Sequence, residues 1–212
     1  MTSMWLRLRR SVRDLCRDRR GVAAIEFAII APVMLVMFLG TVDFSAGIAV
    51  NRKVTLISRT LADLPSQSAA QAINDTYLQN AFTASILIIR PYSQTPVKGT
   101  ISEIYVDSNK KATIQWSKSA IVGSGATVAT LTTSSRSPGD IVTPLVPPAL
   151  LIKQTYLVLS EVSYLYTPLS GYVMTKTGVT LSDSAYTRPR QFACLTYNNV
   201  PVVTTAPTCP TP

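Results

Sequence analysis

The chain contains no histidine among its 212 residues. Histidine is the usual general base near neutral pH and the commonest metal ligand, so its absence excludes every catalytic triad and metal centre that depends on it. Cysteine is also scarce, and Cys16, Cys194 and Cys209 are too few and too far apart for a zinc or iron–sulfur site. The sequence therefore predicts no catalytic residues, no cofactor-binding residues, no metal ligands and a protein that is not an enzyme.

Charged residues are scarce as well, at 15% of the chain, and they are unevenly placed. Residues 1–21 carry seven arginines against Asp14 and Asp18, which gives this short segment a net charge of +5 out of the total of +9. The basic excess borders a hydrophobic run, where it sets membrane topology and attracts anionic lipid. We therefore expect lipid, and no nucleic acid, as the partner of these arginines.

An apolar run extends from Val22 to Val42, and Glu26 is its single charged residue. As a helix, this run is long enough to cross a hydrocarbon core of about 30 Å. A secretory signal would have a shorter apolar core and a small-residue cleavage site, for which Ser45–Ala49 is the alternative candidate. The arginines predict a cytoplasmic N-terminus and a chain that continues on the other side of the membrane.

The helical pattern continues beyond the membrane span. Apolar residues recur there at helical spacing and define one stripe, made of Val50, Val54, Ile57, Leu61 and Leu64. Pro65 is expected to end the helix, because the residue before a proline is driven away from helical backbone angles. A helix from Val22 to Leu64 would measure about 64 Å, and Pro32 would bend its membrane half without breaking it.

Downstream, the pattern predicts one more helix and then strands. Asn74 or Asp75 can cap the helix, which ends at Arg90-Pro91. Two segments, Thr100–Val106 and Ala112–Trp116, are expected to form a hairpin. Further along the chain the pattern predicts a loop at Gly123–Asp140, a central strand at Thr155–Tyr166 and a last strand at Val179–Tyr186.

The predicted fold class is α+β, with a long N-terminal transmembrane helix that continues into a small domain whose antiparallel sheet packs on helix. The predicted parts are an Arg-rich cytoplasmic leader at 1–21, the transmembrane helix at 22–42, its extracytoplasmic continuation at 43–64, the α+β domain at 65–193 and a Pro/Thr-rich tail at 194–212.

Three polar features could indicate function, but each fits a structural role better. Asn74-Asp75-Thr76 matches a glycosylation sequon, but it lies at the predicted helix cap. The glycines of Gly123-Ser-Gly125 lack the Lys-Ser/Thr pair of a phosphate-binding loop, so they predict a loop. Glu161 is expected to pair with Arg188 or Arg190 in the fold.

Cys194 and Cys209 lie on the oxidising side of the membrane if the predicted topology is right. A disulfide between them would close a short loop and contribute about 3 kcal/mol in the chain-entropy model. The alternative is a pair of free thiols in the tail.

Glu26 is costly in an apolar helix, at about 2.5–3.5 kcal/mol near the bilayer centre and less near the interface. One interpretation is that its carboxylate extends to the membrane surface. The other is that it meets a positive partner, which a free amine at Val22 would supply after a cut behind Gly21. That amine could belong to the same chain or to a neighbouring subunit.

Arg20-Gly21 followed by Val-Ala-Ala-Ile-Glu-Phe resembles the processing site of type IV pilin-like proteins. There a prepilin peptidase cuts after the glycine, and glutamate is the fifth mature residue. The longer string from Gly21 to Val33, together with Leu39-Gly-Thr-Val-Asp43, is similar to TadE-like pseudopilins of the tight-adherence (Tad/Flp) pilus system. Further similar strings begin at Asn51, Ser160, Gly171 and Arg188, whereas the tail with Cys194 and Cys209 has no counterpart.

The resemblance implies a pilin-like α+β fold and a non-enzymatic pseudopilin that acts in assembly or secretion of Tad/Flp-type pili. It implies processing between Gly21 and Val22, loss of Cys16 with the leader, and Glu26 as the partner of an N-terminal amine in assembly. The implied partners are a prepilin peptidase, other pilins or pseudopilins, the pilus secretion machinery and inner-membrane lipid.

The implied location is the bacterial inner membrane, with a single span, a cytoplasmic N-terminus and a periplasmic domain that could also enter a surface pilus. The alternative function is that of an unprocessed single-span membrane protein whose extracytoplasmic domain binds a partner or ligand.

Overall fold

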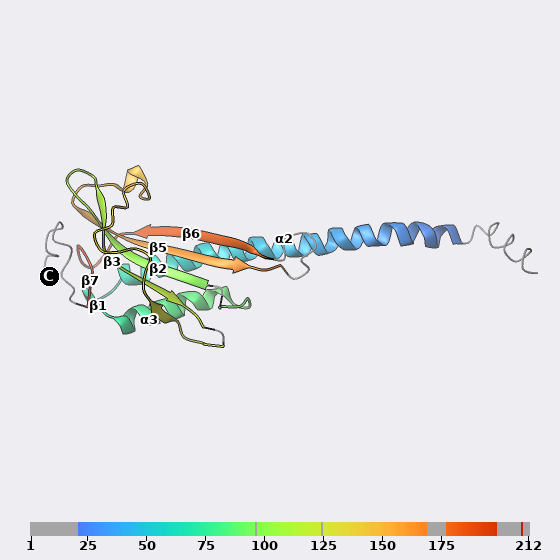
Figure 1. Ribbon diagram of the computed structural model, residues 1–212, viewed down its shortest axis with the longest axis horizontal. Helices are drawn as coiled ribbons and strands as arrows, with labels where there is room; N and C mark the ends of the chain where they lie inside the picture. The colour runs from blue at the N-terminus through green and yellow to red at the C-terminus, as the bar shows by residue number, and fades with distance from the viewer. Residues whose placement is uncertain (1–20, 96, 124, 169–176, 199–208, 210–212) are drawn as a thin grey trace, which may run out of the picture.

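The computed structural model describes residues 21–95, 97–123, 125–168, 177–198 and 209. One long helix leads into a domain built on a five-stranded antiparallel sheet (Figure 1), which confirms the predicted α+β class. The leader and the string that begins at Gly171 lie outside the described residues. The elements in order are α2 (Val22–Ser66), β1 (Ala72–Ile73), α3 (Asp75–Ile86), η2 (Leu87–Ile89), β2 (Val97–Val106), β3 (Ala112–Ile121), β4 (Thr130–Thr132), η3 (Pro148–Leu150), β5 (Thr155–Tyr166), β6 (Val179–Thr187) and β7 (Thr196–Tyr197).

Helix α2 is continuous over 45 residues and carries the predicted apolar stripe, although the sequence predicted an end at Leu64. Its membrane-distal half packs against β5 and β6, while its other half extends away from the domain (Figure 1). Of the stripe, Leu64 is half-buried, and four residues are fully buried: Val50, Val54, Ile57 and Leu61.

Pro65 does not end the helix, contrary to the prediction. The helix continues to Ser66, because tertiary packing outweighs the local bias of the residue before proline. Pro65 and Ser66 are both buried, and the Ser66 hydroxyl donates to the Asp63 carbonyl at 2.7 Å. The Gln67 N–H also donates to that carbonyl, at 3.1 Å, and closes the last turn.

Helix α3 begins where the sequence predicts, and Asn74 is its cap. The Asn74 side-chain oxygen accepts a hydrogen bond of 2.8 Å from the Tyr77 N–H, which satisfies one of the free amides of the first turn. At the other end, Lys53 of α2 donates to the carbonyls of Ile88 and Arg90, at 3.0 and 2.7 Å. The end of the α3–η2 segment is thereby fastened to α2.

The sheet has the strand order β4-β3-β2-β5-β6. The predicted hairpin is present as β2 and β3, each longer than expected, and β5 lies between β2 and β6 as the predicted interior strand. The expected loop at 123–140 contains a short strand, β4, that the sequence did not predict. It pairs with β3 over three residues, too few to produce a hydrophobic period.

The main core lies between the sheet and the two helices. Val158, Val162 and Tyr164 of β5 point toward this core, whereas Leu157 and Leu159 point to a second apolar cluster on the opposite face. The alternation along β5 therefore matches the prediction for a strand with apolar residues on both faces.

Glu161 does not pair with Arg188 or Arg190, contrary to the prediction from the sequence. Its carboxylate pairs with Arg136, from the β4–β5 connection, whose Nε lies 2.6 Å from Glu161 Oε2. Arg190 instead pairs with Asp63 of α2 at 2.8 Å. The prediction was wrong because the path of the connection that brings Arg136 over β5 is not encoded in a local pattern.

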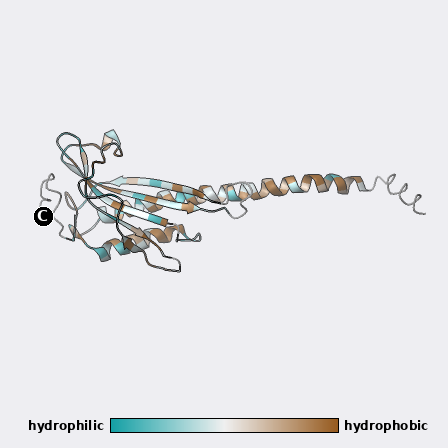
Figure 2. Ribbon diagram, viewed as in Figure 1, coloured by the Kyte–Doolittle hydropathy of each residue, from teal (hydrophilic) through white to brown (hydrophobic). Residues whose placement is uncertain are grey.

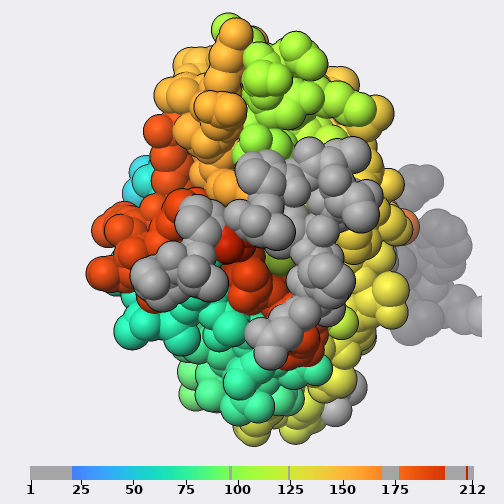
Figure 3. Space-filling view, turned by 90° about the vertical axis from the view of Figure 1, so that its left-hand side faces the viewer, coloured from blue at the N-terminus to red at the C-terminus, as the bar shows by residue number. Residues whose placement is uncertain are grey.

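The end of the domain far from the free half of α2 is closed by residues 194–198, which we call the C-terminal arm. Its strand β7 pairs in parallel with β1, so a two-stranded sheet forms beside the main one. Figure 3 shows this end of the molecule, with the residues after β6 (red) beside those after α2 (teal). Cys194, at the start of the arm, forms a disulfide with Cys209.

Candidate assembly site

The N-terminal half of α2 is an apolar surface that the domain leaves uncovered. Among the described residues, α2 is the single helix long and apolar enough to cross a membrane, and none of its most apolar 18-residue stretch is buried. Figure 2 shows this half as a predominantly hydrophobic rod outside the domain. Large side chains such as Phe27, Met37 and Phe38 are 65–70% exposed, which would be unfavourable in water. This surface fits a single-pass membrane protein.

Gly21 and Val22 lie at the free end of this rod. Val22 is the first helical residue, and Gly21 precedes it as the N-cap without a side-chain cap hydrogen bond. Gly21 is exposed, and a Cβ atom at this position would have no neighbour within 4 Å. Among the described residues, none crowds the side-chain position of Gly21.

Glu26 lies one helical turn beyond Val22 and is exposed. Positions four residues apart are neighbours on a helix surface, so an amine at Val22 and the Glu26 carboxylate would share one face. Among the described residues, neither ion pair involves Glu26. The arrangement leaves the carboxylate available to a positive group at the start of this helix or of an adjacent one.

Burial begins directly after the apolar half, at Asp43. Asp43 is 2% exposed, and its carbonyl accepts a hydrogen bond from the buried hydroxyl of Tyr166, at the end of β5. The Tyr166 ring lies against Gly47 one turn further along, where an added Cβ would be 3.5 Å from the ring. The domain thus holds α2 from the first turn after the predicted span.

Further contacts join the distal half of α2 to the sheet and make it part of the domain. The Ser160 hydroxyl of β5 donates to the Ser58 carbonyl at 2.5 Å, and the Thr187 hydroxyl of β6 donates to the Ala62 carbonyl at 3.0 Å. The distal half of α2 is therefore held to both β5 and β6.

The outer face of the sheet carries an open, polar groove. Two of its hydroxyls, those of Thr100 and Ser119, hydrogen-bond each other at 2.7 Å. Its carboxylate Glu161 is paired with Arg136. In the part of the chain that the structure describes, no group of three His, Cys, Asp or Glu residues could hold a metal ion.

The prediction from the sequence missed that the acidic residue Glu103 is buried. Glu103 of β2 is fully buried, and burial raises the pKa of its carboxyl to about 8, although hydrogen bonds from the Leu195 N–H and the Trp116 indole act in the opposite direction. The signal was available, because Glu103 occupies an inward position of the alternation Ile101, Glu103, Tyr105 in the predicted hairpin.

Comparison with known proteins supports the resemblance for the helix. A family model described as TadE-like protein matches residues 21–63, which span most of α2 and begin at its N-cap. No curated protein and no solved structure matches the chain. The match agrees with the TadE-like resemblance stated from the sequence, and it covers residues 21–63 of the chain.

Proposed function

We propose that this chain is a TadE-like pseudopilin, a non-enzymatic component of Tad/Flp pilus assembly or secretion. The observation that carries the proposal is α2, whose uncovered apolar half has Gly21, Val22 and Glu26 in register at its free end. The family match covers this part of the chain and supports the role.

A prepilin peptidase removes the leader by cutting between Gly21 and Val22. The support for this step is chemical and steric, since a glycine with open space around it precedes the first helical residue. The arginines of residues 1–20 hold the cleavage site at the cytoplasmic face, and the domain lies in the periplasm. The mature protein would remain in the inner membrane or enter a surface pilus.

Glu26 then pairs with an N-terminal amine when subunits pack together. In an apolar environment an ionised carboxylate is tolerated when a positive partner is within hydrogen-bonding distance. The amine of Val22 in the same chain and that in a neighbouring subunit are both candidates, and the second contact would set the relative position of two helices along their length.

The processing step is tested by N-terminal sequencing of the mature protein from cells that produce Tad pili. We expect a chain that begins at Val22, and replacement of Gly21 by a bulky residue should leave the leader attached and stop assembly. A chain that begins at Met1 or near Ala49, or normal activity of the Gly21 variant, would instead favour the unprocessed single-span protein.

The role of Glu26 is tested with Glu26→Ala and with Glu26→Gln, which keeps the shape and removes the charge. Both variants are expected to enter the membrane at normal levels and to lose pilus assembly, whereas Glu26→Asp should retain part of it. Membrane fractionation and counting of surface pili measure the two effects separately. Intact assembly in both neutral variants would remove Glu26 from the mechanism.

A further inference from the structure

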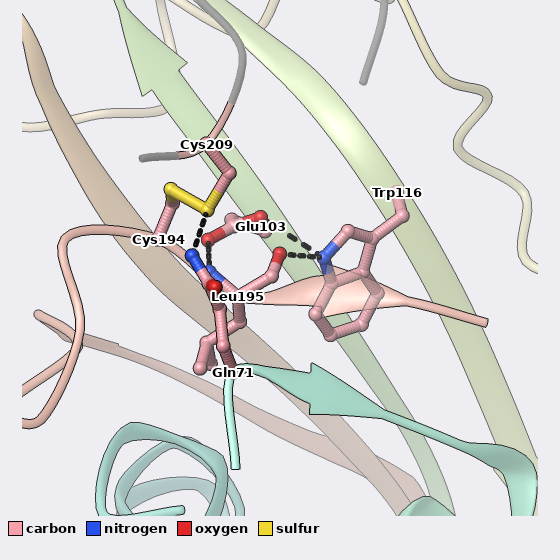
Figure 4. The surroundings of a disulfide bond; sticks show 6 residues. All are labelled: Gln71, Glu103, Trp116, Cys194, Leu195 and Cys209. Carbon is pink, nitrogen blue, oxygen red and sulfur yellow. Dashed lines mark hydrogen bonds between the residues drawn. A yellow bond between two sulfur atoms is a disulfide. The ribbon is translucent and has the colours of Figure 1, made fainter. Parts of the chain in front are cut away.

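A buried carboxyl group lies at the attachment point of the C-terminal arm. Glu103 is fully buried at the membrane-distal end of β2, and neither ion pair among the described residues involves it. Figure 4 shows its side chain between Trp116 of β3 and the arm residue Leu195. An acid in this position has no positive side chain to compensate its charge.

Glu103 and Trp116 together hold the backbone of Leu195. The Leu195 N–H donates to Glu103 Oε1 at 2.6 Å, and the Trp116 indole N–H donates to Glu103 Oε2 at 3.0 Å. The same indole N–H lies 2.9 Å from the Leu195 carbonyl. Because both backbone groups of Leu195 are engaged, these two side chains fix the arm at one residue (Figure 4).

The disulfide does not perform this task. Cys194 and Cys209 both follow β6, so their bridge closes a loop within the C-terminal segment and adds no covalent link to another element of the domain. The arm is held by non-covalent contacts, including the β1–β7 pairing and the stacking of Tyr197 on Trp116 with ring centroids 5.6 Å apart.

Two N–H donors, from Leu195 and Trp116, favour the ionised form of Glu103, but full burial, without an ion pair among the described residues, outweighs them. Tyr105 of β2 and Tyr156 of β5 lie on its sheet side, and burial together with the Glu103 charge raises the pKa of Tyr156 to about 12. On the arm side, Lys118 lies over the Tyr197 ring at 5.1 Å, and the Tyr197 hydroxyl bonds the Asp75 carboxylate. Burial raises the pKa of the Glu103 carboxyl to about 8, which favours its neutral form at pH 7.

We propose that the protonation state of Glu103 determines how tightly the C-terminal arm is held on the domain, so that the arm opens more readily as the pH rises. With the arm open, Glu103 would meet water and titrate near its ordinary pKa of 4.5. The closed state then binds a proton more strongly than the open state. It is favoured most below pH 4.5, and the advantage is lost as the pH rises to about 8.

The test is hydrogen exchange of the Leu195 amide, measured by NMR on the full chain in detergent micelles and corrected for the intrinsic exchange rate at each pH. The opening constant is expected to rise by about tenfold per pH unit between about pH 5 and 8 and then to level off. In Glu103→Gln, which stays neutral, the constant should be independent of pH. The control Asp183→Asn makes the same chemical change on β6 and should preserve the rise.

An opening constant that does not change with pH in the unmodified chain, or a rise that persists in Glu103→Gln, would overturn the proposal. If Glu103→Gln fails to fold, the carboxyl carbon of Glu103 can be titrated by NMR in the unmodified chain. A midpoint near 8 supports the proposal, and a midpoint near 4.5 overturns it.

Discussion

Gly99 illustrates how a single residue sets the distance between the sheet and the helices. A Cβ atom at this position of β2 would lie 3.0 Å from Phe82 Cε1 and 3.1 Å from Leu61 Cδ2. Both side chains are fully buried, so neither can move aside without disturbing the core. The glycine is therefore needed for close approach of α2 and α3 to the strand.

We expect Gly99→Ala to destabilise the domain by about 1–3 kcal/mol through overpacking. Gly123→Ala is the matched control, because the nearest atom to its added Cβ is 3.9 Å away. Chemical denaturation followed by circular dichroism measures both variants. Equal stability of the two variants would show that the core at Gly99 relaxes freely.

At the same scale, the sequence predicted some residues and missed others for identifiable reasons. The cap at Asn74 was predictable because capping depends on neighbours three residues away. Glu26 was singled out because a charge within an apolar run is conspicuous, and its role stays a prediction. The Glu161–Arg136 pair and the environment of Glu103 depend on segments far apart in the sequence, and no local pattern records them.

At the scale of elements, α2 is one continuous helix whose two halves have different surroundings. Its N-terminal half is apolar and exposed, and its distal half packs in the core of the domain. The length of the apolar run and the helical period that follows it were both visible in the sequence, so the helix and its buried stripe were predictable. The short strands β4 and β7 were not, because two or three residues carry no period and their pairing is decided by the tertiary fold.

Adjacent residues on α2 provide a direct test of the stripe. Ile57 is fully buried, whereas its neighbour Leu56 is 51% exposed on a different side of the helix. Ile57→Ala should reduce the free energy of unfolding by about 2–5 kcal/mol, because it leaves a cavity in the main core. Leu56→Ala should change it by less than about 0.5 kcal/mol.

Denaturant unfolding of the detergent-solubilised chains distinguishes the two outcomes. If Leu56→Ala proved as destabilising as Ile57→Ala, the exposed side of α2 would contribute to the fold of the monomer. Normal stability with a defect in pilus assembly would instead indicate that the exposed side contacts another subunit.

For the molecule as a whole, one part of α2 is suited to a membrane and another part belongs to the folded domain. From Val22 to Val42 no residue is buried, and burial begins at Asp43. The apolar half therefore contributes nothing to the core, and its side chains are available to lipid or to other subunits. The distal half carries Val50 and Val54, which the core encloses completely.

This division predicts how the chain responds to shortening from its N-terminus. A chain that begins at Asp43 keeps every buried residue and should unfold cooperatively without detergent, with its sheet intact by circular dichroism. A chain that begins at Thr55 loses Val50 and Val54 and should be at least about 3 kcal/mol less stable, since burial of each valine contributes about 1.5 kcal/mol or more. If the chain from Asp43 failed to fold while the full chain folded in detergent, the apolar half would be part of the domain, and its surface could not be reserved for membrane or subunit contacts.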